Sequence, residues 1–126
     1  MRASLDVRDA ATLRGMEVGH TERLARNESF FRELNERIND AAVSFGADDH
    51  RYEFVCECSD PHCTERLTLS RVEYDHVRGD GKRFVLAHGH VTDEIEYVVE
   101  HADDHLVIEK LGAAAEVATR LDPRTA

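Results

Sequence analysis

The chain has 126 residues, of which 41% are hydrophobic and 33% charged, enough for one domain with a modest core. It carries 26 Asp and Glu against 16 Lys and Arg, a net charge of −10, whereas a protein that neutralises phosphates needs a surplus of cations. We therefore expect neither nucleic acid nor an anionic membrane as a partner, and expect another protein with a basic or neutral surface instead.

Residues 1–19 are predicted to form a weakly ordered leader. Gly15 and Gly19 interrupt a helix there, and the acidic residues of this segment exclude the apolar core of a signal peptide. No stretch of the chain approaches the roughly 20 apolar residues of a membrane span. The expected location is cytoplasmic, where three cysteines are more typical of a metal or redox site than of disulfides.

Residues 20–46 are predicted to form an amphipathic helix. Apolar residues recur at every seventh position of this stretch: Leu24, Phe31, Ile38 and Phe45. Such a stripe indicates one apolar helix face, which either packs on the domain's own core or pairs with a second copy. A homodimer through residues 24–45 is therefore one of the two alternatives, although a length of roughly three heptads is marginal for a coiled coil.

Residues 47–126 are predicted to form a small α+β body. Strands are expected over residues 51–57, 66–69, 83–87, 95–100 and 106–109. Short helices are expected over residues 71–78 and 112–121, and the first begins with the capping box Ser70–Glu73. The chain thus predicts one α+β domain, a long N-terminal helix followed by a small mixed sheet, a zinc knuckle and two short helices.

Cys56, Cys58 and Cys63 form a C-x-C-x4-C cluster. Thiolates are soft ligands that suit zinc. As in a zinc knuckle, two close cysteines stand at the end of a predicted strand, and the turn at residues 59–62 would deliver the third. We expect a structural Zn²⁺ ion here, which adds folding free energy to a small body.

The fourth ligand of a tetrahedral site would be a histidine, because no cysteine remains. His90 is the first choice, since it follows a strand expected to lie beside the cysteine strand. His88 is the second choice. His62 is the third, because it is adjacent to Cys63 and less free to reach the same ion.

Two other interpretations of the cysteines are open. They could be small buried apolar residues, or a redox-active pair with a low pKa. Glu57 and Asp60 lie among the cysteines and are expected to raise the pKa of the thiols, which argues against the redox interpretation.

Several longer motifs occur along the chain. They are Arg26-Asn27-Glu28, Phe31-Arg32-Glu33, Asn35-Glu36-Arg37-Ile38, Cys56-Glu57-Cys58, Cys63-Thr64-Glu65, Arg83-Phe84-Val85, Gly89-His90, Val107-Ile108-Glu109-Lys110 and Asp122-Pro123-Arg124. In these motifs the chain, from about Arg26 onward, resembles a group of short uncharacterised bacterial proteins. The resemblance implies that the cysteines and His90 belong to one site, and it supplies no activity. In that group a proline commonly precedes the Gly-His pair where this chain has His88, which leaves open whether His88 adds to or replaces His90.

The leading functional hypothesis is a zinc-stabilised module of regulatory or protein-binding type. One alternative is a redox or zinc-responsive sensor that uses the cysteine cluster. Another is a small metalloenzyme with an open site made of His88, His90 and Glu94. The sequence contains no phosphate-binding glycine loop and no nucleophile elbow, so a non-enzymatic module is favoured over an enzyme, and the enzyme alternative stays open.

Overall fold

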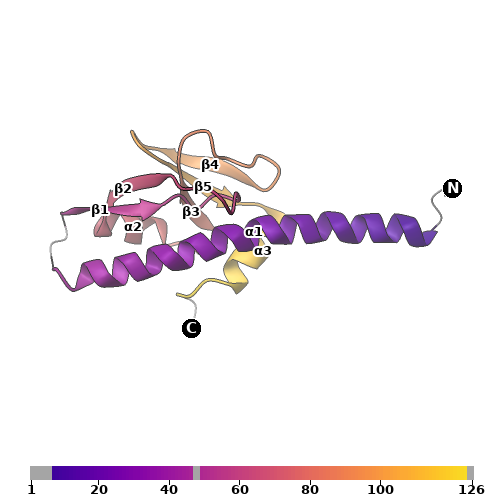
Figure 1. Ribbon diagram of the computed structural model, residues 1–126, viewed down its shortest axis with the longest axis horizontal. Helices are drawn as coiled ribbons and strands as arrows, with labels where there is room; N and C mark the ends of the chain where they lie inside the picture. Colours follow the sequence, from indigo (N-terminus) through magenta and orange to yellow (C-terminus); the bar gives the residue numbers. More distant parts are fainter. Residues whose placement is uncertain (1–6, 47–48, 125–126) are drawn as a thin grey trace.

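The computed structural model describes residues 7–46 and 49–124, with the backbone alone for residues 7–18. Helix α1 (Val7–Val43) lies along one side of the body, and its N-terminal part projects beyond the body (Figure 1). Of the expected leader, residues 1–6 lie outside the described residues and the rest belongs to α1; the division into leader, helix and body stays a prediction. No helix of the described residues combines the length and apolar character that a membrane crossing needs.

The C-terminal end of α1 lies three residues before the expected end at residue 46. The N–H of Gly46 donates to the carbonyl of Val43, and Gly46 has a φ of +68°. This left-handed conformation favours glycine, which explains the stop. Phe31 of the predicted apolar stripe is buried, whereas Phe45 lies beyond the helix with 76% of its surface exposed. The predicted apolar stripe is therefore wrong at its last position, Phe45.

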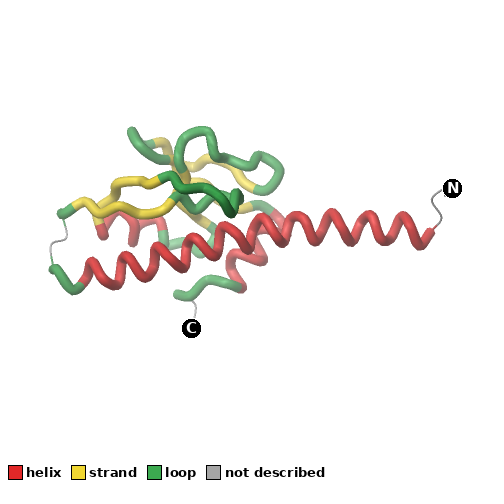
Figure 2. Tube along the Cα trace, viewed as in Figure 1, coloured by secondary structure: helices red, strands yellow, loops and turns green. Residues whose placement is uncertain are grey.

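The five strands form two small antiparallel sheets rather than the single mixed sheet expected (Figures 1 and 2). Strands β1 (Arg51–Val55) and β2 (Arg66–Ser70) form the first sheet. The second has the order β3-β5-β4, with β3 (Arg83–Leu86), β4 (Glu96–His101) and β5 (Leu106–Lys110). All pairings are antiparallel.

Two short helices complete the body, α2 (Arg71–Val77) and α3 (Gly112–Arg120). The predicted capping box of α2 is confirmed, because the Ser70 hydroxyl accepts from the N–H of Glu73 and the Glu73 carboxylate accepts from the N–H of Ser70. The α+β class is confirmed, and each expected strand and short helix is found within two residues of its predicted ends.

The main core lies between the two sheets, α2 and the inner face of α1. Phe54 of β1 stacks on Tyr74 of α2 with 4.6 Å between ring centroids, and neither side chain is exposed. Phe84 of β3 lies under the guanidinium of Arg32, which reaches in from α1 to 4.5 Å from the ring centroid. The core therefore ties α1 to both sheets, and it fixes the segments that follow β1 and β3.

Candidate metal centre

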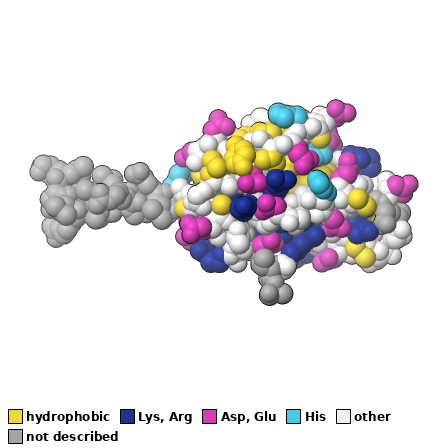
Figure 3. All heavy atoms as spheres, turned by 180° about the vertical axis from the view of Figure 1, so that it is seen from behind, with side chains coloured by type: hydrophobic (Ala, Val, Ile, Leu, Met, Phe, Trp, Pro, Cys, Tyr) yellow, Lys and Arg dark blue, Asp and Glu magenta, His cyan; other side chains and the backbone are white. Residues whose placement is uncertain are grey.

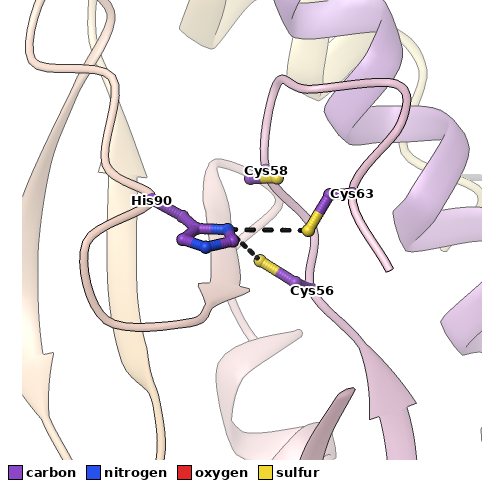
Figure 4. A group of neighbouring side chains, drawn as sticks. All are labelled: Cys56, Cys58, Cys63 and His90. Carbon is purple, nitrogen blue, oxygen red and sulfur yellow. Dashed lines mark hydrogen bonds between the residues drawn. The ribbon is translucent and has the colours of Figure 1, made fainter. Parts of the chain in front are cut away.

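Three cysteines and one histidine lie together just beyond the ends of β1 and β3 (Figure 4). The ligand atoms of Cys56, Cys58, Cys63 and His90 all lie within 4.8 Å of one another. His90 Nδ1 is 3.5 Å from both Cys56 Sγ and Cys63 Sγ. Zinc bonds of about 2.3 Å to sulfur and 2.0 Å to nitrogen give a tetrahedron with an N–S edge of about 3.5 Å. The four side chains are thus spaced to hold one tetrahedral ion.

The segment after β1 presents the first two cysteines. The N–H of Cys56 donates to the carbonyl of Glu65, and the N–H of Glu57 donates to the carbonyl of Val85. These bonds keep the segment extended and attach the first sheet to β3. Because side chains alternate along extended chain, Cys56 and Cys58 point to one side and Glu57 to the other.

A tight turn returns the third cysteine to the first two. The N–H of Cys63 donates to the carbonyl of Asp60, and the Asp60 carboxylate accepts from the N–H of His62 at 2.9 Å. Asp60 thus uses its side chain and its carbonyl to close the turn, as aspartates commonly do. The expected turn at residues 59–62 delivers Cys63 to the cluster in this way.

The histidine arrives on a second turn, after β3. The N–H of Ala87 donates to Cys56 Sγ at 3.1 Å, and the N–H of His90 donates to the carbonyl of Ala87. Gly89 between them has a φ of +84°, a conformation in which other residues are strained. This glycine bends the chain so that the imidazole of His90 turns towards the sulfur atoms (Figure 4).

The two ligand-bearing segments are also joined directly, without a metal. The hydroxyls of Ser59 and Thr92 are hydrogen-bonded at 2.8 Å. From α1, the Asn27 amide donates to the carbonyl of Ser59 at 3.1 Å. Side-chain hydrogen bonds therefore hold both segments to each other and to the helix, so the site is organised by the fold.

Glu57, between two of the cysteines, is fully buried and hydrogen-bonded on both carboxylate oxygens. Its Oε2 accepts from the Tyr74 hydroxyl at 2.7 Å and from the Asn35 amide at 2.8 Å, and its Oε1 accepts from the N–H of Val85 at 3.0 Å. Burial raises the pKa of Glu57, while these donors favour the ionised form. The network, here called the Glu57 network, connects α1, α2 and β3 behind the cysteines.

A second buried cluster, the lysine triad, supports the histidine segment. Lys110 forms ion pairs with Glu28 of α1 and Glu96 of β4, and all three side chains are fully buried. Glu96 also accepts from the N–H of Thr92 at 2.8 Å. Burial raises the pKa of Glu96 to about 7 and lowers the pKa of Lys110, whereas the contact of the ammonium group with two carboxylates favours the charged forms. The triad therefore links α1 to the chain beside His90 through charged groups removed from water.

The thiols differ in their acidity. Hydrogen bonding from Cys56, with help from His90, lowers the pKa of Cys58 to about 5, although burial opposes this. The hydrogen bond with Cys58 and burial raise the pKa of Cys56, and burial raises the pKa of Cys63. The expectation that neighbouring acids raise the pKa of every thiol is wrong at Cys58. One of those acids, Glu57, faces the interior and not the sulfur atoms. One thiolate is thus favoured, as metal binding requires.

The structure brings the three cysteines to His90 rather than to either alternative histidine. His88 is exposed, with Nε2 3.0 Å from the carbonyl oxygen of Ala102 in the β4–β5 turn. His62 is exposed too. Glu94, the carboxylate of the metalloenzyme alternative, is exposed and outside the cluster. No protein-family model, no curated protein and no solved structure matches this chain.

The residues that hold the ligand segments in place were not anticipated from the sequence. They are Asn27, Asn35, Glu57, Tyr74, Thr92, Glu96 and Lys110. Local signals were available for Glu57, because the middle residue of an extended C-x-C segment must point away from the two cysteines, and for the inward direction of Lys110 on its strand. For the others, the hydrogen bonds join residues distant in the sequence, which a local pattern does not reveal.

Proposed function

We propose that this chain is a zinc-stabilised module that acts by binding another protein. The observation that carries the zinc assignment is the set of three thiols and one imidazole spaced for a single tetrahedral ion. Cysteine and histidine are the ligands that zinc prefers in structural sites. Four protein ligands close the coordination shell, so no position remains for an activated water, and the site supports a structural more than a catalytic role.

The surface supports the protein-binding part of the proposal. The chain carries a net charge of −10. On the face in Figure 3, acidic and basic side chains are interspersed around a group of hydrophobic ones, and the basic ones do not gather into one broad patch. A surface of this kind favours association with a protein over binding to a phosphate backbone.

The decisive experiment measures zinc per chain in protein purified without added metal. We expect about one zinc ion per chain in the wild type, lost in Cys63→Ser and in His90→Ala. The matched control is His88→Ala, which removes a histidine two residues away that lies outside the cluster and should keep its zinc. Cobalt substitution should give thiolate charge-transfer absorption. A wild type without metal, or a His88→Ala variant that loses it, would contradict the proposed site.

Protein binding is tested separately, with zinc-loaded wild type as bait and the Cys63→Ser variant beside it. We expect a reproducible protein partner that the wild type captures and the variant does not. Absence of a reproducible partner, in protein that holds zinc, would remove the binding role and leave the metal site standing.

A sensor function is a second candidate, favoured by the lowered pKa of Cys58 and the partial exposure of Cys63. Hydrogen peroxide would oxidise two thiolates to one disulfide. The two electrons released, with two protons from solvent, convert the peroxide to two waters, and the zinc ion would leave. Zinc release by mild peroxide, reversed by a thiol reductant and accompanied by a change in partner binding, would support the sensor. Zinc that is retained under mild peroxide would exclude it.

A further inference from the structure

The outer face of α1 carries a shallow groove at its exposed aromatic residue. The groove is lined by Arg26, Ser29, Phe30, Glu33 and Leu121. Phe30 is 59% exposed, although its neighbour Phe31 is buried in the core. Ser29 is buried at the base of the groove, and its hydroxyl has no hydrogen-bond partner among the described residues. An aromatic ring in water beside an unsatisfied hydroxyl is unfavourable for an isolated chain.

The charges along this face are arranged symmetrically about Phe30. Arg26 and Glu33 have a midpoint at position 29.5, and so do Glu22 and Arg37. At about 1.5 Å of rise per residue, that midpoint lies within about 0.8 Å of Phe30 along the helix axis. Each pair has opposite signs at its two ends. A helix with this pattern is complementary in charge to an antiparallel copy of itself.

We propose that this chain forms a two-fold symmetric dimer in which the α1 helices pack antiparallel, with the two Phe30 rings at the axis. In this register Arg26 of each copy faces Glu33 of the other, and Glu22 faces Arg37. Among the described residues Arg26 pairs with Glu22, at 2.9 Å and with both side chains about half exposed, so it can exchange partners at little cost. The contact is isologous and closed, which limits association to two copies.

The length of α1 gives this arrangement a second contact. The helix has 37 residues, and its N-terminal part projects beyond the body of its own chain (Figure 1). In the antiparallel register, the projecting part of one helix runs alongside the partner's residues 41–46. The overlap lengthens the contact between the two helices beyond the Phe30 axis.

The test is the mass of the full-length protein in solution, by analytical ultracentrifugation over roughly 10 to 500 µM. We expect a dimer that dissociates on dilution, and a Phe30→Glu variant whose dissociation constant rises at least about 30-fold, since a central aromatic residue in a two-fold interface is lost twice. Val72→Glu, which also places a charge at an exposed apolar position, should leave the dimer unchanged. Circular dichroism and zinc content report whether each variant is folded.

A charge exchange distinguishes a second copy from any other occupant of the groove. Arg26→Glu and Glu33→Arg should each weaken the dimer about 10-fold, and the double variant should restore it, because only a self-complementary contact is repaired by reversing both charges in one chain. A wild type that is monomeric throughout, a dimer indifferent to Phe30→Glu, or a double variant weaker than both single variants would overturn the proposal. Zinc content is measured independently, so this failure leaves the metal site untouched.

Discussion

The Glu57 network and the lysine triad both bury carboxylates beside the metal centre, but they compensate the charge differently. Glu57 receives three neutral donors, from Asn35, Tyr74 and the Val85 backbone. In the triad, two buried carboxylates face the single cation Lys110. A network of neutral donors weakens step by step when one member is lost, whereas the triad depends on one side chain. Substitutions in these two clusters, which hold the same site, should therefore reduce stability in different ways.

The largest effect should come from Lys110→Met. The substitution leaves Glu28 and Glu96 buried without a cation, and breaking a buried ion pair costs about 3–5 kcal/mol. Urea unfolding with excess zinc measures the loss. Lys82→Met is the matched control, because Lys82 is the other lysine of the chain and only partly buried. A Lys110→Met protein as stable as the control would show that the triad is not held together by charge.

The next effect should come from Glu57→Leu, which removes the acceptor of three buried donors. We expect a loss of about 3 kcal/mol, with about 1.5 kcal/mol for Tyr74→Phe, which removes one of the three hydrogen bonds. The same unfolding experiment serves both variants. Equal losses in the two would contradict a network that weakens step by step.

A smaller effect concerns pH and separates the triad from the Glu57 network. The pKa of Glu96 is raised by burial from 4.5 to about 7, so its contribution to stability is present at low pH and is lost as pH rises through about 7. Without the positive charge of Lys110, the pKa of Glu96 should rise further. The deficit of Lys110→Met should therefore shrink by about 1 kcal/mol between pH 8 and pH 6. Unfolding of wild type and variant at both pH values tests this, and a constant deficit would contradict it.

The smallest effect should come from the exposed ion pair of Arg51 and Glu73, which are 2.8 Å apart with about half of each side chain in water. Arg51→Gln should cost less than about 1 kcal/mol, because solvent screens such pairs. It provides a surface reference for the two buried clusters. A loss as large as that of Tyr74→Phe would mean that burial does not separate these interactions.

Much of the fold could be predicted because local chemistry determines it. Ser70 and Glu73 start α2 by bonding each other's backbone, and Gly46 ends the turn after α1. The C-x-C spacing and a histidine shortly after β3 likewise identify the cluster. These signals lie within a few residues of the feature they determine, so the sequence alone displays them.

The supports of the site could not be predicted, because each needs a partner far along the chain. Leu106, Ile108 and Lys110 alternate along β5, which indicates that Lys110 points inward, but nothing local identifies Glu28 as its partner. The two-sheet arrangement was missed for a related reason. The bond from the N–H of Glu57 to the carbonyl of Val85 attaches one sheet to the other through the extended cysteine segment, and it joins residues 28 positions apart that no local pattern connects.

The pairing of Glu28 with Lys110 has a consequence for the order in which the chain is made. Helix α1 is synthesised before the strands and α3, yet Glu28 and Arg32 find their partners much later in the chain, at Lys110 and at the carbonyl of Ala118. Until those residues leave the ribosome, the inner face of α1 carries charges that water must solvate and apolar groups without cover. Folding of this domain must therefore wait until α3 has been synthesised, and a nascent chain that stops before α3 leaves its first helix without the contacts that hold it to the body.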